Sequence, residues 1–431
     1  MTVEITPRQL CGEVLAIASK SDVHRLLICA ALADKPTEII LTGSMGADTL
    51  SEDIRATMDC LVALGAKTLV HSTDDGKTVI TVSPITEVPA NPVLDCGESG
   101  STLRFILPVA AALLKGDNKI TITGKGRLPD RPIGELKSVL TQGGVTFSAP
   151  KLPFTISGEF IAGTYEIPGN VSSQYITGLL LGLSAISGVE TTTAKIRITS
   201  ELQSAAYIDI TTNAMSKFGV NVQKVCEDGL TCFKIETGSN AKQFTSPGTL
   251  IADGDWSNAA FFLALKNLGH DVSVSQLNAK SPQGDKAIVE MLDLLAKTPD
   301  DDGVRTISLS EIPDLLPIMA VVAAFSAGET HFVNGERLRI KESDRLASVC
   351  ELITKLGGKA EELPAGLIVY PQPLSGGQID SYNDHRIVMA AAIAAANCTS
   401  PVTITGAQAV NKSYPTFFED YKRLGGTINV I

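Results

Sequence analysis

The feature that most constrains this chain is a short polar cluster that runs directly into an Ala- and Leu-rich stretch and recurs six times. The clusters span residues 19–25, 97–104, 172–174, 255–258, 312–314 and 383–386. The apolar stretches that follow span residues 26–33, 105–114, 176–186, 259–265, 315–327 and 387–396. Because a helix that is apolar on nearly all sides belongs in a core, we predict buried helices whose N-terminal amides point toward the polar clusters.

Four cations occupy these clusters at the end of a helix where positive charge is disfavoured: Lys20, Arg25, Arg104 and Arg386. The helix dipole opposes a cation there by about 0.3 to 1 kcal/mol. Ser, Thr, Asp and Asn in the same clusters are explained more simply as helix N-caps. The cations have no such explanation, so we expect something negative, a phosphate or a carboxylate, to offset them.

A strand signal follows each apolar stretch, at residues 38–43, 119–124, 195–199, 271–274, 330–335 and 402–406. Amphipathic helices that end in Gly are then predicted at residues 54–64, 133–142, 208–218, 346–356 and 414–424, and the fourth copy, residues 287–297, is degenerate. The repeat length of about 60 to 80 residues exceeds that of solenoids, so each copy is interpreted as an α/β subdomain, three in each half.

The composition excludes several classes of protein. A chain of 431 residues is too long for one core, and a net charge of −11 argues against a nucleic-acid surface. The eight cysteines form no C-x-x-C pair, which favours reduced thiols over a zinc site or disulfides. Without a signal-peptide pattern or an apolar run long enough to span a bilayer, we expect a cytoplasmic protein with no membrane partner.

Residues 339–345 form the densest charge cluster of the chain. A charge run is usually a solvated helix face, but this one lies between a predicted strand and a helix, as Arg127 and Arg131 do in the second copy. Loops at one end of a sheet converge, so a ligand site is favoured. The chain has no P-loop, H-E-x-x-H or G-x-S-x-G motif, so nucleotide, metal and acyl-enzyme chemistry have no support.

Taken in order along the full length, these motifs resemble the enolpyruvyl transferases, and among them the branch that acts on shikimate 3-phosphate. The residues that carry the resemblance are Ser19 to Ser21, Arg25, Gly100 to Arg104, Arg127, Arg131 to Gly134, Ser172 to Gln174, Ser204, Tyr207, Pro313, Asp314, Lys341 to Arg345, Asn383 to Arg386 and Lys412. The resemblance implies an α/β fold of two domains, each of three βαβαββ-type units with buried helices. The first domain would span residues 20–254 and the second residues 1–19 plus 255–431, with crossovers near 19–20 and 252–256 and ligands in the cleft.

The resemblance also implies the reaction. Phosphoenolpyruvate would transfer its enolpyruvyl group to the 5-hydroxyl of shikimate 3-phosphate and release phosphate, with no cofactor and no metal, in a monomer. By this resemblance the catalytic residues are Asp314, Glu342 and Lys20. Shikimate 3-phosphate would be held by Lys20, Ser21, Arg25, Ser172, Ser173, Gln174, Ser204, Tyr207, Asp314 and Lys341. Phosphoenolpyruvate would be held by Lys20, Gly100, Arg127, Arg345, His385, Arg386 and Lys412.

The chemistry of two multiply charged anions agrees with these residues. Fixed cations must offset the repulsion between the anions, and Arg presents a fork that suits carboxylate and phosphate oxygens. Addition of a hydroxyl to the enol carbon requires a base for the hydroxyl proton and an acid for the methylene carbon, for which Asp314 and Glu342 are the candidates. Nearby cations favour ionised Glu342, so it can serve as the acid only if desolvation or proton sharing opposes them.

Three alternatives remain open at this point. The sister enolpyruvyl transferases that act on UDP-N-acetylglucosamine carry a Cys in the loop matching residues 124–131, and this loop has none. RNA 3′-phosphate cyclases share the repeated unit, but the acidic balance of the chain argues against an RNA substrate. A non-catalytic anion-binding module is the third alternative.

Overall fold

The computed structural model describes residues 1–43, 46–74, 76–187, 192–237, 243–299 and 303–431. The chain divides into two compact units. We name them for their place in the sequence: the central unit is Ala18–Asp253, and the terminal unit is Met1–Ile17 with Gly254–Ile431. The crossovers expected near 19–20 and 252–256 lie beside these limits, and the assignment of the two units as domains stays a prediction.

The central unit contains three four-stranded sheets among its described residues. Their strand orders are β14 (Thr249–Ile251), β3 (Thr37–Leu41), β5 (Thr78–Ser83), β4 (Lys67–Ser72); β6 (Val93–Asp95), β7 (Ile120–Thr123), β9 (Phe154–Gly158), β8 (Val145–Phe147); and β10 (Thr164–Ile167), β11 (Thr192–Ile198), β13 (Leu230–Thr237), β12 (Gln223–Glu227). In each sheet the first pair of strands is parallel and the next two pairs are antiparallel.

The terminal unit has the same strand pattern in two sheets. Their orders are β20 (Gly377–Asp380), β21 (Val402–Thr405), β1 (Thr2–Thr6), β22 (Thr427–Val430); and β16 (Val304–Ser308), β17 (Glu329–Val333), β19 (Gly366–Tyr370), β18 (Lys359–Leu363). A parallel pair joins β15 (Asp271–Ser275) to β2 (Cys11–Leu15). Since β1 pairs with β22, the first and last strands of the described chain share one sheet.

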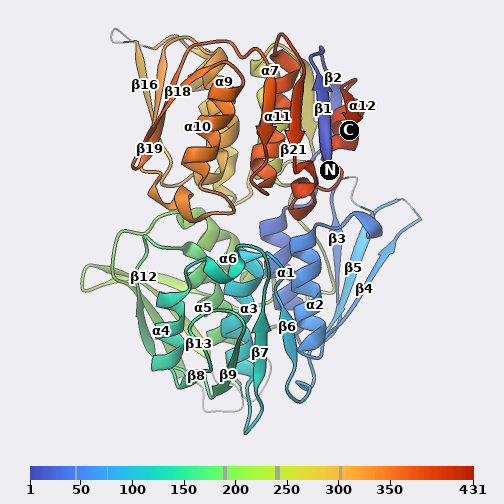
Figure 1. Cartoon of the computed structure of the whole chain (residues 1–431). Coiled ribbons are helices and arrows are strands. Elements are labelled where there is room, and N and C mark those ends of the chain that lie inside the picture. The colour runs from blue at the N-terminus through green and yellow to red at the C-terminus, as the bar shows by residue number, and fades with distance from the viewer. Residues whose placement is uncertain (44–45, 75, 188–191, 238–242, 300–302) are drawn as a thin grey trace. The chain divides into compact units, whose positions relative to one another are not determined.

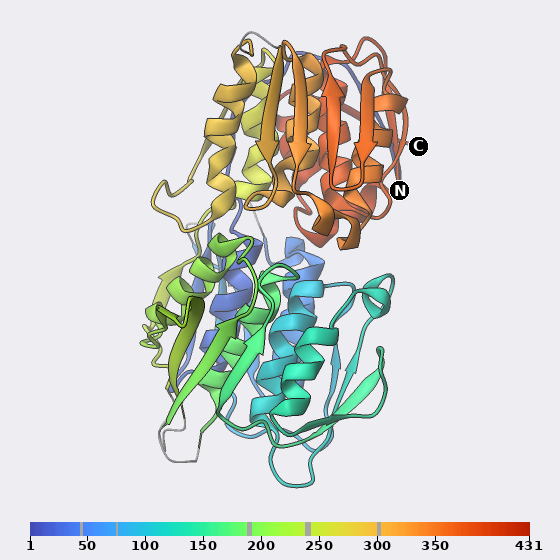
Figure 2. The same ribbon diagram turned by 90° about the vertical axis from the view of Figure 1, so that its left-hand side faces the viewer.

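The predicted buried helices are confirmed, because their apolar residues are almost entirely inaccessible to solvent. They are α1 (Lys20–Leu32), α3 (Gly100–Leu113) and α5 (Ser173–Ala185) in the central unit, and α7 (Trp256–Asn267), α9 (Leu316–Phe325) and α11 (His385–Asn397) in the terminal unit. In the terminal unit, α9, α10 (Arg345–Lys355) and α11 pack between strands β18 and β19 on one side and β1 and β21 on the other (Figure 1). The β16–β19 sheet faces the viewer in Figure 2.

The remaining helices are α2 (Glu52–Ala63), α4 (Gly134–Gln142), α6 (Ala205–Lys217), α8 (Ile288–Ala296), α10 (Arg345–Lys355) and α12 (Phe417–Arg423). The short 3₁₀ helices are η1 (Ala47–Thr49), η2 (Leu128–Asp130), η3 (Gly284–Ala287), η4 (Pro313–Leu315), η5 (Glu336–Ile340) and η6 (Ala407–Lys412). The helix predicted from residue 414 begins only at Phe417, after Pro415, because the residue before a proline is pushed out of the helical region. No helix among the described residues combines the length and the apolar character needed to cross a membrane.

The capping interpretation of the polar clusters is confirmed for five buried helices. The N-cap side chains that accept a backbone N–H are Ser19, Ser99, Ser172, Asp255 and Asp384. Each satisfies one of the amides that a helix leaves without an intrahelical partner. The apolar helices can therefore begin inside the protein, with their first residues held in a defined orientation.

Helices α3 and α5 approach each other closely at two glycines of α5. A Cβ atom on Gly178 would lie 2.0 Å from the carbonyl oxygen of Arg104, and one on Gly182 would lie 2.7 Å from the backbone of Pro108. Neither neighbour is a flexible side chain that could move aside. The α3–α5 contact therefore requires glycine at these positions, which the sequence pattern did not indicate.

We predict that Gly178→Ala destabilises the protein by about 1 to 3 kcal/mol, because the added methyl group must push α3 and α5 apart. Urea unfolding monitored by circular dichroism would measure the loss. Gly134→Ala is the matched control, since Gly134 opens α4 and a Cβ there meets nothing within 4 Å. Equal stability of the Gly178 variant and wild type would show that the helix contact is looser than the structure indicates.

Candidate active site

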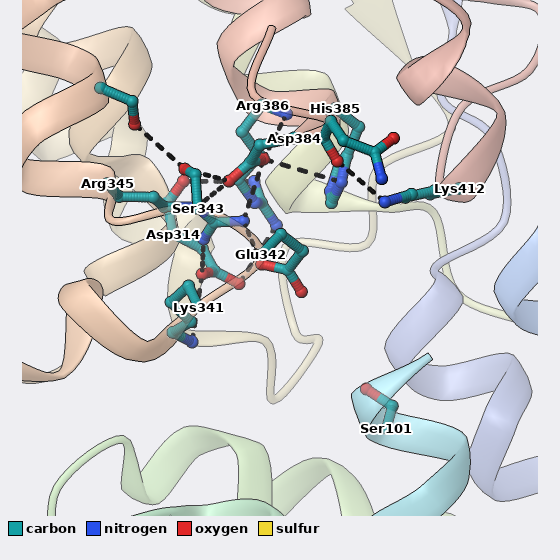
Figure 3. A network of polar contacts seen from close by, with 12 residues as sticks. Ser101, Asp314, Lys341, Glu342, Ser343, Arg345, Asp384, His385, Arg386 and Lys412 are labelled. Carbon is teal, nitrogen blue, oxygen red and sulfur yellow. Dashed lines mark hydrogen bonds and ion pairs between the residues drawn. The ribbon is translucent and has the colours of Figure 1, made fainter. Parts of the chain in front are cut away.

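The terminal unit brings together six charged residues that we call the Arg345 cluster (Figure 3). Its members are Asp314, Lys341, Glu342, Arg345, Asp384 and Arg386. Asp314 lies in η4, the next three lie between the end of η5 and the start of α10, and the last two lie at the start of α11. Elements that are distant in the sequence thus place their charges at one point.

Arg345 lies at the centre of the cluster with a side chain that is only 1% exposed. Its Nε donates to Asp384 at 2.8 Å, its Nη1 to Asp314 at 2.7 Å, and its Nη2 to Glu342 at 2.7 Å. Burial alone would lower the pKa of Arg345, but the three carboxylates together raise it above its ordinary value. The guanidinium is therefore a permanent cation.

Asp314 is surrounded by three cations. Besides Arg345, its carboxylate contacts Lys341 Nζ at 3.4 Å and Arg386 Nη2 at 3.2 Å. Its side chain is 15% exposed, so one edge of this carboxylate is reached by solvent. Burial and the neighbouring Arg345 lower the pKa of Lys341, and Asp314 opposes that shift. A carboxylate held among cations is suited to receive a polar ligand at its exposed edge.

Asp384 serves two elements at once. One oxygen accepts the backbone N–H of Arg386 at 2.9 Å as the cap of α11, while the other accepts from Arg345 and from the Ser343 hydroxyl at 3.0 Å. Burial has the largest single effect and would raise the pKa of Asp384, but the charge and hydrogen bond of Arg345 together with His385 outweigh it, and the net shift is downward. Asp384 is therefore an ionised, fully buried counterion.

His385 and Lys412 lie at the edge of this cluster in Figure 3. The His385 side chain is 3% exposed, and its Nδ1 lies 3.9 Å from Asp384. Lys412, the last residue of η6, is also buried and donates from Nζ to the carbonyl oxygen of Asn383 at 2.8 Å. That carbonyl belongs to a tight turn, because Asn383 has a φ of 55°. The turn thus holds the Lys412 ammonium beside the start of α11.

The central unit presents a second set of cations. Lys20, the first residue of α1, forms a 2.7 Å ion pair with Asp53 of α2, and both side chains are mostly buried. Arg25 lies one turn further along α1 and donates to Thr211, Thr177 and the carbonyl oxygen of Tyr207. Burial lowers the pKa of Arg25 to about 10. Arg25 therefore remains charged at neutral pH while it joins α1 to α5 and α6.

The start of α3 is packed against two guanidinium groups. A Cβ atom on Gly100 would lie 2.6 Å from Arg131 Nη1 and 2.8 Å from Arg104 Nη1, so a larger residue there would displace the two guanidinium groups from their present positions. Arg104 donates to the side chain of Gln174 at 2.8 Å, and Gln174 donates to Ser101 at 2.9 Å. These hydrogen bonds connect the N-termini of α3 and α5, and they include Gln174, a predicted ligand of shikimate 3-phosphate.

Four other predicted ligand residues lie at the starts of helices. Ser172 caps α5 and Ser173 is its first residue. Ser204 takes the N-cap position of α6 with a φ of 55°, and Arg127 takes the N-cap position of η2, where its side chain is exposed. Lys20 and Arg127, which are both predicted to hold phosphoenolpyruvate, lie on different elements: Lys20 is the first residue of α1, and Arg127 precedes η2.

Nothing in the sequence indicated a role for three carboxylates that the structure shows near candidate site residues. Two of them form ion pairs with such residues, and the third is affected by the charge of one. Asp53 pairs with Lys20, Asp384 pairs with Arg345, and Asp285 lies buried under the electrostatic influence of Asp314. Asp384 was visible only as a helix cap, and Asp53 only as a polar residue near the start of a helix. The residues that the structure describes contain no group of three or more His, Cys, Asp or Glu side chains with the geometry of a metal site.

Comparison with known proteins identifies a family. A family model described as EPSP synthase (3-phosphoshikimate 1-carboxyvinyltransferase) matches residues 5–421. A protein of Clostridium novyi named 3-phosphoshikimate 1-carboxyvinyltransferase is 37% identical over 454 residues, which cover 99% of this chain and 98% of that protein. A protein of Clostridium perfringens (strain SM101) with the same name is 38% identical over 441 residues, covering 99% of each.

Solved structures show the same fold at lower sequence identity. An EPSP synthase from Acinetobacter baumannii superposes with a TM-score of 0.75 at 22% identity and covers 99% of both chains. The enolpyruvyl transferase NikO from Streptomyces tendae superposes with a TM-score of 0.75 at 15% identity, over 99% of this chain and 98% of that one. These matches confirm the predicted α/β fold of the enolpyruvyl transferases, whereas the three repeated units in each domain stay a prediction. The family resemblance is confirmed by the family model and the named relatives.

We predict that Asp384→Ala destabilises the terminal unit by about 3 to 5 kcal/mol, because it leaves a buried guanidinium without its shared counterion. Chemical unfolding at neutral pH would measure the loss. Asp130→Ala is the matched control: Asp130 forms an ion pair of equal length, 2.8 Å, with Lys151, but both side chains are largely exposed and its midpoint should not change. Similar losses in both variants would contradict the role of burial.

Proposed function

The chain belongs to the EPSP synthase (3-phosphoshikimate 1-carboxyvinyltransferase) family, and we propose that the Arg345 cluster carries the chemistry of its reaction. As a transferase of the shikimate pathway, it transfers the enolpyruvyl group of phosphoenolpyruvate to the 5-hydroxyl of shikimate 3-phosphate and releases phosphate. The observation that carries the proposal is the Asp314 carboxylate, which is partly exposed and contacts three cations.

Asp314 is the proposed base for the 5-hydroxyl proton. The hydroxyl must lose that proton as its oxygen attacks the enol carbon of phosphoenolpyruvate, and a carboxylate within hydrogen-bond reach can accept it. Lys341 and Arg386 hold the Asp314 carboxylate in a fixed orientation. The same cations are proposed to compensate the negative charge of the two substrates. Charges that the protein already holds in position are most effective, because they need not reorganise as the reaction proceeds.

Glu342 is the proposed acid that protonates the methylene carbon. It adjoins Lys341 in the chain and its carboxylate is held by Arg345 at 2.7 Å, with the side chain 24% exposed. Elimination of phosphate from the resulting intermediate requires that the methyl group lose a proton again, and the same carboxyl group is placed to accept it. Lys20 of the central unit is proposed as the third catalytic residue, oriented by its ion pair with Asp53.

The ligand sets proposed for the two substrates follow the resemblance of the motifs. For shikimate 3-phosphate they are Lys20, Ser21, Arg25, Ser172, Ser173, Gln174, Ser204, Tyr207, Asp314 and Lys341. For phosphoenolpyruvate they are Lys20, Gly100, Arg127, Arg345, His385, Arg386 and Lys412. Support comes from the clustering of cations at helix N-termini, where backbone amides add to their attraction for anions. A monomeric, cytoplasmic enzyme that needs no cofactor remains the proposed state.

The first test is calorimetry with shikimate 3-phosphate alone and then with phosphoenolpyruvate added. We expect shikimate 3-phosphate to bind and the second addition to release phosphate, measured by a colorimetric assay. UDP-N-acetylglucosamine is the control acceptor and should give neither heat nor phosphate. Turnover of that sugar nucleotide in place of shikimate 3-phosphate would refute the proposed substrate.

We predict that Glu342→Gln loses about 10² to 10⁴ in turnover and binds shikimate 3-phosphate nearly as wild type does, because an acid–base group is removed while the ligand contacts remain. Phosphate release and calorimetry would measure the two effects. Glu336→Gln is the control, since Glu336 is an exposed carboxylate in the preceding η5. A loss of affinity with unchanged kcat would make Glu342 a structural partner of Arg345.

Asp314→Asn should lower turnover by a similar factor but also weaken the binding of shikimate 3-phosphate, because its carboxylate is proposed to touch the attacking hydroxyl. The two variants are then distinguished by calorimetry with that ligand alone. Should Asp314→Asn bind shikimate 3-phosphate as tightly as Glu342→Gln does, direct contact between Asp314 and the acceptor would be excluded.

A further inference from the structure

Asp285 is a fully buried carboxyl group that the proposed mechanism does not use. It lies in η3 of the terminal unit, 3% exposed, and its Oδ2 accepts a hydrogen bond from the Ser257 hydroxyl in the first turn of α7. Its Oδ1 is buried without a hydrogen-bond partner among the described residues. A buried polar atom without a hydrogen bond destabilises the folded state, so its presence needs a physical explanation.

The loop that carries Asp285 is fixed firmly to the start of α7. The Gln283 side chain accepts the backbone N–H of Trp256 at 3.1 Å and donates to the carbonyl oxygen of Gly254 at 2.8 Å. Lys286, the neighbour on the other side, turns outward and donates to the carbonyl oxygen of Ser281 at 3.0 Å. Asp285 therefore cannot relax toward solvent and holds its position next to α7.

Helix α7 packs against both η3, which carries Asp285, and η4, which carries Asp314, so the two carboxyl groups lie on elements that share one neighbour. Asp314 of η4 and Arg386 of α11 influence Asp285 most among charged groups, followed by Asp255, the N-cap of α7. The ionisable side chains of α8, Glu290 and Asp293, are exposed. Burial, and then the negative charge of Asp314, raise the pKa of Asp285 from 3.8 to about 6.

The cations around Asp314 disfavour its protonation, and a second carboxylate nearby would reduce that effect. Three cations contact it, and each opposes the arrival of a proton because a proton adds positive charge. A base must nevertheless accept the proton of the attacking hydroxyl. A nearby negative charge acts in the opposite direction and favours proton transfer to Asp314.

We infer that Asp285 is a positioning residue whose ionised form supplies that negative charge, favours proton acceptance by Asp314, and makes turnover depend on the Ser257–Asp285 hydrogen bond. This inference rests on the proposed role of Asp314. It assigns Asp285 no contact with either substrate. Turnover then falls as pH decreases and Asp285 becomes protonated.

The test is the pH dependence of kcat in three variants, with phosphate release as the assay and both substrates saturating. Asp285→Asn removes the titrating group, so the acidic limb of the profile should move to lower pH and the plateau should fall by about tenfold or less, because the base itself remains. Ser257→Ala removes a hydrogen bond that favours the ionised form, so its limb should move to higher pH by about half a unit. Asp293→Asn, an exposed carboxylate of α8, is the control and should match wild type.

Thermal unfolding provides a second reading that needs no substrate. A carboxyl group with a raised pKa in the folded state makes the wild type lose stability as pH rises from its ordinary value of 3.8 through about 6. Asp285→Asn lacks that titration, so its midpoint temperature relative to wild type should increase over the same range. A difference that stays constant with pH would contradict a buried titrating Asp285.

The outcomes distinguish a failure of this inference from a failure of the proposed function. Limbs that shift in opposite directions in Asp285→Asn and Ser257→Ala support the inference, whereas unmoved limbs or shifts in the same direction overturn it. If Asp285→Asn fails to fold, the shift in Ser257→Ala decides alone. Absence of phosphate release by the wild type itself would instead refute the proposed function.

Discussion

The terminal unit depends on the guanidinium of Arg345, which is buried among Asp314, Glu342 and Asp384. Removing any one carboxylate leaves a charge in a medium that solvates it poorly, so the three acids and the arginine hold one another in place. The acids come from η4, from the segment between η5 and α10, and from the start of α11. A single planar cation thus fixes the relative placement of three chain segments and the orientation of two proposed catalytic carboxylates.

Buried helix N-termini connect this electrostatic requirement to the fold. An apolar helix that begins inside the protein exposes unpaired amides, and a capping side chain is needed to satisfy them. In α11 the capping residue, Asp384, is also the counterion of Arg345, so one carboxylate satisfies a backbone amide and a guanidinium. Capping and the proposed ligand binding are therefore compatible explanations of the same polar clusters.

The two units balance their cations differently. In the central unit, Arg25 is surrounded by hydroxyl and carbonyl oxygens, and burial shifts its pKa down to about 10. In the terminal unit, Arg345 is surrounded by carboxylates, which raise its pKa instead. The hydrogen bonds of Arg25 described above go to neutral acceptors, and the buried Asp22 acts on it only as a nearby charge, whereas Arg345 contacts three carboxylates directly. Asp314, the partly exposed carboxylate of this cluster, is the proposed point of contact with the acceptor substrate.

The sequence alone indicated the six buried helices, the strands that follow them and the family, because helix periodicity and ordered motifs are local properties of the chain. It also selected Asp314, Lys341, Glu342, Arg345 and Arg386, which the structure brings together. It could not pair Lys20 with Asp53 or Arg345 with Asp384, since these contacts join residues that are 33 and 39 positions apart.

The tertiary structure alone decided the close approach of α3 and α5 at Gly178 and the buried state of Asp285. In the sequence, Asp285 stands in a polar stretch with no periodic signal, and nothing there distinguishes it from an exposed loop carboxylate. Its environment is created by α7, η4 and α11 together. Local residue patterns determine which elements form, whereas desolvation and charge–charge interactions depend on which elements pack against one another.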